Sequence, residues 1–478
     1  MAEIHKSLIR EKPLVRRITE RILEFDPDLL PADVALQTKL LVLDSIGCAL
    51  AAIGEHANER ALRTLRTLGG NPECTVIGSK DRLPVTSAVM VNGVLIREID
   101  MNDAYIGPGQ MGHPSDNIAV ALTVGEKTRA SGKDVLAAIV VGYELYCRIQ
   151  DIIKSRGPWD HVTASALAAP AIAGRLMDMN ADQLANAMAL SAAHGNTLAA
   201  VRSGQLSNAK AMANALVAYQ ATLCTLLASE GVTGPLGAID GKGGLAQALL
   251  SGADLNVLIE PIHGRFRISD VSIKAYPCIG TAQAMVAAVL EAHSDVRDPL
   301  KEIKEIEIRM ADTPFVRGQV EDKDRRYPTS RETADHSFYY LAAAALLDGQ
   351  MSEAQFEHER WNEPGLKSLM ERIAIGTDPA LNAYTPGSFP CVLTLMMSNG
   401  ETRAIEVFYP KGHPKNRMSP AEVEVKFRRG AHKILSEAQQ NQIISLVHDL
   451  DKLDDVGELM KELAVEGRKE QSVKSSDP

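Results

Sequence analysis

Aromatic side chains and paired cysteines are both scarce in this chain of 478 residues. Phe, Trp and Tyr make up 4% of it, which argues against a platform on which the bases of single-stranded nucleic acid stack. Acidic residues outnumber basic ones, 61 to 51, and this balance argues against a surface for duplex DNA. The six cysteines include no CxxC pair, so neither a zinc ribbon nor a sequence-local iron–sulfur motif is expected. The composition predicts no nucleic-acid partner.

Signatures of nucleotide, protease and membrane function are missing as well. The sequence contains no GxxxxGK[ST], HExxH or GxSxG motif, which disfavours ATP, metalloprotease and serine-hydrolase chemistry. Residues 107–112 match GxGxxG by letter, but no strand is expected before them and His113-Pro114 follows in place of a helix. The longest apolar stretches fall short of the roughly 18–20 residues of a membrane span. The first residues lack the apolar core of a secretory signal, so we expect a cytoplasmic protein, or a mitochondrial-matrix protein if the source is eukaryotic.

Residues 1–265 have the pattern of a helical domain. Apolar residues recur at a spacing of three to four over residues 36–53, which is typical of an amphipathic helix. Residues 135–149 and 211–227 are rich in Ala, Leu and Val over lengths too great for ordinary strands, and a further helix is expected from Asp182. Glycine-containing breaks separate these segments. We therefore predict an all-helical domain here.

The pattern changes near residue 265. Residues 305–310 alternate between apolar and charged, and Asn399-Gly400 lies between the apolar runs 392–397 and 405–409, the strongest short signal for a hairpin. Helices are predicted over residues 334–349, 364–375, 420–429 and 437–463, followed by a polar, disordered tail at 466–478. The fold class predicted is mainly α. A large all-helical domain is built from residues 1–265 and 406–478, a smaller α+β lid of residues 266–405 is inserted in it, and a cleft lies at the seam.

The densest polar cluster comprises residues 100–103 and 112–117. It contains Asp100, Asp103, His113 and Asp116 among glycines and prolines, and such a loop can present several acid/base groups at one point, as proton abstraction from carbon requires. The alternative is a turn and capping segment, with Ser115 or Asp116 as N-cap of a helix starting at residue 118. His113 lies just before that helix start, where a substrate carboxylate would be favoured.

Other polar residues are weaker signals when taken singly. His161 precedes an Ala-rich helix, where Asp160 or Thr163 would act as a cap, and His194 is expected in the core. Lys210 begins a nearly charge-free helix, so its ammonium group either reaches water or faces an anion. Lys274 follows the proposed domain boundary, and Asp335 and Ser337 are expected as caps of the helix that follows them.

Several motifs, in the same order, resemble those of a known family. They are Asp100-x-Asn-Asp103, residues 113–117, Asp160-His161, Lys210, Lys274-x-Tyr-Pro277, Ala334-Asp335-His336-Ser337 and Tyr409-Pro-x-Gly-His413 before Lys426-Phe427. Together they resemble the MmgE/PrpD family, which contains 2-methylcitrate dehydratases and cis-aconitate decarboxylases. The match runs from about residue 40 to residue 427.

The resemblance implies the two-part fold described above, a homodimer, and chemistry on di- or tricarboxylates without a metal or other cofactor. Motif matching places Asp100, His113, His161, Lys210 and Lys274 at the active-site positions of the family. The substrate-binding set that it implies consists of Lys210, Lys274, Tyr327, Asn102 and Asp103.

Within the family, residues 113–117 and 409–413 look closer to the dehydratases. Residues 278–283 lack a histidine found there in dehydratases, and the segment around Lys210 is shorter and less basic. We expect dehydration of a 2-methylcitrate-like tricarboxylate, with Lys210 and Lys274 on substrate carboxylates, and His113 and His161 as the acid/base pair that Asp100 orients or tunes. The alternatives are a decarboxylase of cis-aconitate type, an epimerase of an amino-dicarboxylate, and a non-enzymatic helical scaffold.

Overall fold

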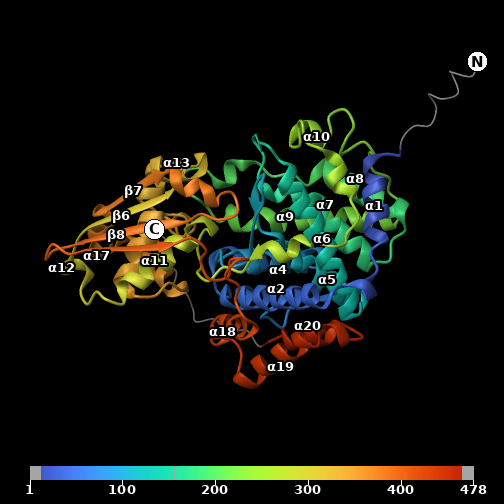
Figure 1. Ribbon diagram of the computed structural model, residues 1–478. Helices are drawn as coiled ribbons and strands as arrows, with labels where there is room; N and C mark the ends of the chain where they lie inside the picture. The colour runs from blue at the N-terminus through green and yellow to red at the C-terminus, as the bar shows by residue number, and fades with distance from the viewer. Residues whose placement is uncertain (1–11, 156, 466–478) are drawn as a thin grey trace, which may run out of the picture.

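The structure, a computed structural model, describes residues 12–155 and 157–465, so the predicted disorder of residues 466–478 lies outside it. The chain is mainly α, as predicted. The helices up to residue 248 gather on one side of the molecule (Figure 1). They are α1 (Leu14–Leu23), α2 (Ala32–Ala51), α3 (His56–Leu68), α4 (Val85–Arg97), α5 (Ile118–Thr128), α6 (Gly132–Ile152), α7 (Ser165–Leu176), α8 (Ala181–His194), α9 (Ala209–Ser229) and α10 (Leu245–Ala248).

Short strands interrupt this helical region, so the prediction of an all-helical domain is wrong in detail. β1 (Cys74–Thr75) pairs with β2 (Arg82–Leu83). β3 (Ala104–Ile106) pairs with both β4 (Met111–Gly112) and β5 (Val271–Ser272). Strands of two or three residues leave no alternation of apolar and polar residues for a sequence pattern to detect. The β3–β4 hairpin matters for the site because it lies between Asp103 and His113.

A four-stranded sheet dominates the other side of the molecule. Its order is β7-β6-β8-β9, with β6 (Ile303–Ala311) parallel to β7 (Ile373–Asp378) and antiparallel to β8 (Cys391–Met397). The predicted hairpin is confirmed, because β8 pairs with β9 (Thr402–Val407) across Asn399-Gly400. The helices of this region are α11 (Gln283–His293), α12 (Pro299–Glu302), α13 (Pro314–Glu321), α14 (Lys323–Arg326), α15 (Arg331–Ala334), α16 (Phe338–Asp348) and α17 (Pro364–Glu371).

The last helices return to the first side of the molecule, where α18 packs against α2 (Figure 1). They are α18 (Pro420–Ala431), α19 (Glu437–His448) and α20 (Gly457–Glu462). The single helix predicted over residues 437–463 is therefore two helices. The chain turns between them because the backbone carbonyl of Leu453 accepts a hydrogen bond from Gly132 at the start of α6.

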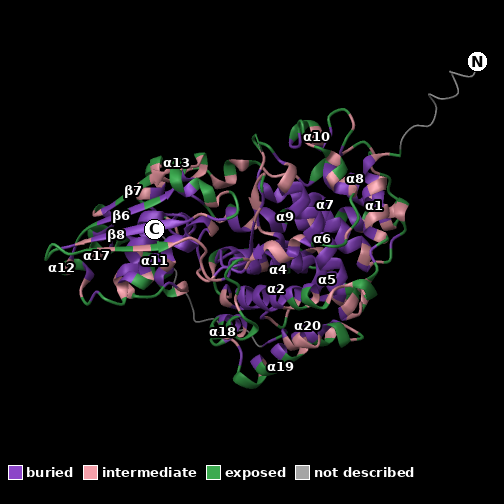
Figure 2. Cartoon of the chain, in the orientation of Figure 1, coloured by how far each residue is buried: buried purple, intermediate pink, exposed green. Residues whose placement is uncertain are grey.

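Two large clusters of buried apolar side chains form among the described residues. One draws on residues 14–273 and 423–465, and the other on residues 278–397. Figure 2 shows buried residues running through both sides of the molecule. α2 and α9 are long and apolar enough for a membrane span, but 72% and 61% of their most apolar windows are buried inside the structure, as is usual for core helices. Some of the polar side chains discussed below lie on segments of the chain that connect the two clusters.

The contact between α2 and α18 depends on two glycines. A Cβ at Gly47 would lie 3.0 Å from Cα of Phe427, and a Cβ at Gly430 would collide with the backbone oxygen of Gly47. Small residues at this crossing let the two backbones approach closely. α18 also carries Lys426, whose ammonium group donates to the backbone oxygen of Met101 at 2.9 Å, next to the predicted active-site loop.

We predict that Gly430→Ala lowers the free energy of unfolding by about 1–3 kcal/mol, because the added methyl group separates α18 from α2. The matched control is Gly318→Ala in α13, where an added Cβ would meet nothing within 4 Å. Alanine there should stabilise the protein by about 0.5–1 kcal/mol through helix propensity. Urea denaturation of both variants checks this, and equal stability of the two would contradict the close-packing account.

Candidate active site

Asp100 lies at the centre of a buried group of charges just beyond the end of α4. Its backbone has a φ of 53°, a left-handed conformation that costs a non-glycine residue about 1–2 kcal/mol. Lys274 donates to both the backbone oxygen and Oδ1 of Asp100, each at 2.6 Å. Arg97, in the last turn of α4, reaches the same carboxylate oxygen at 2.5 Å. These contacts hold the strained residue in place.

Lys210 links Asp100 to the part of the chain that carries the sheet. Its Nζ lies 2.9 and 3.0 Å from the two carboxylate oxygens of Asp335 and 3.1 Å from Oδ2 of Asp100. Lys210 and Lys274 are each 1% exposed. The sequence left open whether the Lys210 ammonium reaches water or faces an anion, and the structure shows that it faces two carboxylates.

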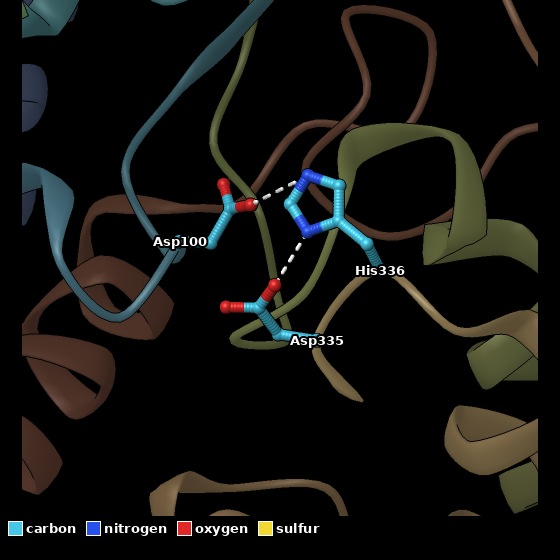
Figure 3. A group of neighbouring side chains, drawn as sticks. All are labelled: Asp100, Asp335 and His336. Carbon is cyan, nitrogen blue, oxygen red and sulfur yellow. Dashed lines mark hydrogen bonds and ion pairs between the residues drawn. The ribbon is translucent and has the colours of Figure 1, made fainter. Parts of the chain in front are cut away.

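The imidazole of His336 bridges the same two carboxylates (Figure 3). Its Nδ1 makes a short contact with Oδ1 of Asp335, and its Nε2 lies 3.5 Å from Oδ2 of Asp100. Asp335 and His336 lie between α15 and α16, whereas Asp100 and Lys210 come from the helical side. The cluster therefore joins segments that are far apart in the sequence.

Burial and neighbouring cations act in opposite directions on these acids. Burial raises the pKa of Asp100, but Arg97, Lys210 and Lys274 together outweigh it and hold the pKa well below its ordinary value. Asp335 behaves in the same way: Lys210 and His336 outweigh burial and lower its pKa. For Asp116 burial prevails over Arg97 and raises the pKa to about 6. At pH 7 the cluster thus contains ionised carboxylates held by buried cations.

Asn102 and Asp103 organise the loop before the β3–β4 hairpin. Oδ1 of Asp103 accepts hydrogen bonds from the hydroxyl of Ser115 at 2.6 Å and from its backbone N–H at 3.2 Å. Asn102 donates to the Ser115 hydroxyl and to Asp116, each at 2.9 Å. The helix-cap alternative for Ser115 and Asp116 is wrong, because neither side chain caps α5. Burial raises the pKa of Asp103 to about 7.

His113 follows this hairpin, and the loop fixes its tautomer. Nδ1 lies 2.5 Å from the backbone oxygen of Asp103, and because a carbonyl only accepts, Nδ1 carries the proton and Nε2 keeps a lone pair. Burial, followed by the charges of Arg97 and Lys274, holds the pKa of His113 well below its ordinary value. A neutral imidazole with a free lone pair is the form that a general base requires.

His161 lies beside His113, with the two ring centroids 5.4 Å apart. Its Nδ1 is 3.4 Å from Oδ1 of Asp160, and Arg202 approaches its Nε2 at 3.5 Å. The predicted cap is confirmed, because Asp160 accepts the backbone N–H of Val162 at 3.2 Å. The same carboxylate also pairs with Arg202 at 2.7 Å. Asp160 thus caps the 3₁₀ helix His161–Ala164 and orients a second imidazole of the site.

The structure brings the five predicted catalytic residues together. Asp100 contacts Lys210 and Lys274 directly, and His113 is close enough to Asp100, Lys274 and His161 for their charges to act on it. Tyr327 is not brought to this group: it is 52% exposed, and its hydroxyl donates to Glu371 at 3.1 Å. His194, expected in the core, is exposed.

Asp100, Asp335 and His336 also form a group whose ligand-type atoms lie within 4.8 Å of one another, the spacing of a metal site. Lys210, however, lies within 3.1 Å of both carboxylates, and Lys274 and Arg97 neutralise Asp100 further. A divalent cation would have to displace these ammonium and guanidinium groups. The donor set fits an anion held by the cations better than a metal held by the acids.

Arg97, Asp335 and His336 belong to this cluster but are not among the site residues predicted from the sequence. Arg97 stands at the end of an otherwise apolar stretch of sequence. That pattern is an ambiguous signal, because the charged group of such a residue often reaches water. Asp335 was read as a cap, although only Ser337 has that role, accepting the N–H of Tyr340 at 3.1 Å. Asp335 meets Lys210 across 125 positions of sequence, a separation that no local pattern encodes.

A small cavity of about 20 Å³ adjoins the cluster. Its wall includes Lys274, Gln283, Ser388 and Lys411. Of the five predicted catalytic residues, only Lys274 lines it. The carboxylates and lysines of the cluster are thus almost inaccessible to solvent, each no more than 1% exposed.

We predict that Lys210→Met lowers the free energy of unfolding by about 3–5 kcal/mol, because it leaves the buried Asp335 and Asp100 short of a cation. The double variant Lys210→Met/Asp335→Asn should recover most of this loss, since it removes a charge of each sign. Urea denaturation at pH 7 measures both. The pKa of Asp335 is lowered in the folded protein, so the stabilisation that it contributes is present above about pH 4 and is lost as the pH falls further. A double variant no more stable than the single one would contradict this account.

Comparison with known proteins finds matches that cover most of this chain. The MmgE/PrpD N-terminal domain matches residues 16–258, and the MmgE/PrpD C-terminal domain matches residues 276–452. The chain is 27% identical over 455 residues to cis-aconitate decarboxylase of Mus musculus, covering 89% of this chain and 88% of that protein. It is 26% identical over 438 residues to 2-methylcitrate dehydratase of Cupriavidus necator, covering 86% and 89%. The 2-methylcitrate dehydratase of Salmonella typhimurium is 24% identical over 437 residues, covering 86% and 89%. These identities do not separate the two activities, but with both domain matches they identify this chain as a member of the MmgE/PrpD family.

Proposed function

We propose that the protein is a lyase that dehydrates a 2-methylcitrate-like tricarboxylate to the corresponding alkene without a metal cofactor. The observation that carries the proposal is the buried group in which Lys210 and Lys274 pair with Asp100, together with the adjacent imidazoles of His113 and His161. Relatives named as 2-methylcitrate dehydratase and cis-aconitate decarboxylase, matched over most of the chain, support this class of substrate.

The lysines and Arg97 supply the charge that the reaction needs. Removing a proton from carbon beside a carboxylate builds negative charge on that carboxylate, and preorganised cations in a site without water stabilise it. In the structure these cations are balanced by Asp100 and Asp335. At Lys210 and Lys274, substrate carboxylates would take the place of some of these aspartate contacts.

The histidines supply the acid/base groups. Nε2 of His113 has a free lone pair, and His161 is oriented by Asp160. One imidazole takes the proton from carbon, the electrons of the C–H bond form the double bond, and the C–O bond breaks. The departing hydroxide accepts a proton from the other imidazole, in its protonated form, and leaves as water.

Substrate access suggests how the parts of the chain work together. We propose that residues 266–405 act as a lid on a body made of residues 1–265 and 406–478. The separate apolar cluster of residues 278–397 supports such a lid, whereas the apolar side chains of residues 266–273 pack in the cluster of the body. Contacts between them are polar: Thr333 and Ser330 bond the backbone of Leu206 at 2.8 and 2.7 Å, and Arg325 donates to the backbone oxygen of Arg202 at 3.0 Å. Polar contacts of this kind can be exchanged for water when a lid opens. A homodimer, which the family resemblance implies, is part of the same proposal.

A substrate panel tests the proposed activity. We predict that 2-methylcitrate gives rising enoate absorbance with no release of CO₂, and that the rate is the same with EDTA present. CO₂ released from cis-aconitate would instead establish the second candidate, a decarboxylase, which the similarity to the mouse enzyme favours. Failure to convert 2-methylcitrate, citrate or cis-aconitate would contradict both.

We predict that His113→Ala and His161→Ala each reduce turnover of the confirmed substrate about 10²–10⁴-fold, the usual contribution of a general acid or base. The control is His448→Ala, whose ring pairs with Glu424 at the surface between α19 and α18. That variant should keep the activity of the unmodified enzyme. Full activity in both site variants would remove the histidines from the mechanism.

A further inference from the structure

His336 has an arrangement that the proposed acid/base pair does not explain. Its Nδ1 contacts Asp335, and because the lowered pKa of Asp335 keeps that carboxylate ionised, Nδ1 must be the nitrogen that carries the proton. The lone pair of Nε2 then faces Oδ2 of Asp100 at 3.5 Å (Figure 3). Two electron-rich atoms thus face each other inside the protein.

Oδ2 of Asp100 is ready to accept a hydrogen bond. It is buried and has no hydrogen-bond donor among the described residues, although Lys210 lies at ion-pair distance, 3.1 Å. A proton on Nε2 of His336 would point toward this oxygen. The ring is therefore set between two carboxylates in the way an imidazolium would be.

The charged groups that face His336 explain why it is neutral in this arrangement. Burial, followed by the positive charge of Lys210, lowers the pKa of His336 to about 4, against the opposite effects of Asp335 and Asp100. Arg331 reaches the other oxygen of Asp335 at only 3.9 Å and pairs with Glu55 at 3.4 Å. Burial raises the pKa of the nearby Cys278 thiol, so that group stays neutral. Lys210 is thus the principal cation that opposes a proton on His336.

A bound polycarboxylate would change this balance. Arg97, Lys210 and Lys274 face Asp100, Asp335 and Asp116, so the buried charges nearly cancel before an anion enters. An anion at Lys210 and Lys274 adds up to three negative charges, and an uncompensated buried charge costs several kcal/mol. It also neutralises Lys210, the cation that keeps His336 unprotonated.

We propose that His336 takes up a proton when a polycarboxylate binds at Lys210 and Lys274, and that the resulting imidazolium holds Asp100 and Asp335 while the lysines turn to the anion. The proton comes from solvent and forms an N–H bond at Nε2, and no bond to carbon is made or broken. His336 is thus a positioning residue of the site. This inference rests on the proposed function, because it needs a polycarboxylate as ligand.

His113 is less suited to take this proton. Burial and the cations Arg97 and Lys274 oppose its protonation, against the opposite effect of Asp100. His336 instead lies between two carboxylates. The two histidines therefore form a matched pair for a test.

Calorimetric titration with propane-1,2,3-tricarboxylate tests the inference. This ligand has no hydroxyl group to eliminate, so its binding is measured without turnover. At pH 7, in PIPES and in Tris, whose heats of ionisation differ, the dependence of the binding heat on buffer gives the number of protons taken up. We predict an uptake of about one proton for the unmodified enzyme and for His113→Gln, and almost none for His336→Gln. Glutamine can still bond Asp335 but offers no site for the proton.

Each result has a distinct meaning. If the ligand binds and the unmodified enzyme and His336→Gln take up the same number of protons, the inference is overturned but the proposed function stands. The same conclusion follows if proton uptake is lost only in His113→Gln. If His336→Gln does not fold, Asp335→Asn is measured in its place. Removing one of the two carboxylates that face the ring should reduce proton uptake, and unchanged proton uptake overturns the inference. Absence of binding to the unmodified enzyme in both buffers would contradict the proposed function as well.

Discussion

Lys210 forms ion pairs with two buried carboxylates that lie more than two hundred residues apart, Asp100 and Asp335. A buried ion pair stabilises a protein only when every charge in it finds a partner, because each unpaired charge keeps its desolvation cost. Lys274, Arg97 and the ring of His336 complete this network around Asp100. The same contacts hold the strained backbone of Asp100 and join the two apolar cores at their polar seam.

The network also supplies what the proposed chemistry needs. Cations already free of water respond strongly to a nearby negative charge, and they require little rearrangement when that charge develops during the reaction. The imidazoles of His113 and His161 are each oriented by a neighbouring oxygen, and burial together with the charges of Arg97 and Lys274 lowers the pKa of His113. A substrate carboxylate therefore competes with Asp100 and Asp335 for the same ammonium groups. This competition links binding, lid movement and the protonation of His336 in one account.

Much of the fold could be predicted because its signals are local. The Asn399-Gly400 turn determines the β8–β9 hairpin, and long Ala- and Leu-rich stretches become α6 and α9. Strands of two or three residues were missed because they are too short to show alternation, and the pairing of β3 with β5 also joins segments far apart in the sequence. Ser115 and Asp335 were taken for helix caps because the same residue types serve both purposes, and only the folded chain shows that they face Asp103 and Lys210 instead. The five predicted catalytic residues were assigned through family motifs, not through any pattern of spacing.

The most direct measurement of the central claim is an experimental structure of the protein with propane-1,2,3-tricarboxylate bound. The account predicts carboxylate oxygens within hydrogen-bond distance of Nζ of Lys210 and Lys274, and the carbon chain of the ligand facing Nε2 of His113. A ligand bound away from these lysines would contradict it. So would a metal ion coordinated by Asp100, Asp335 and His336.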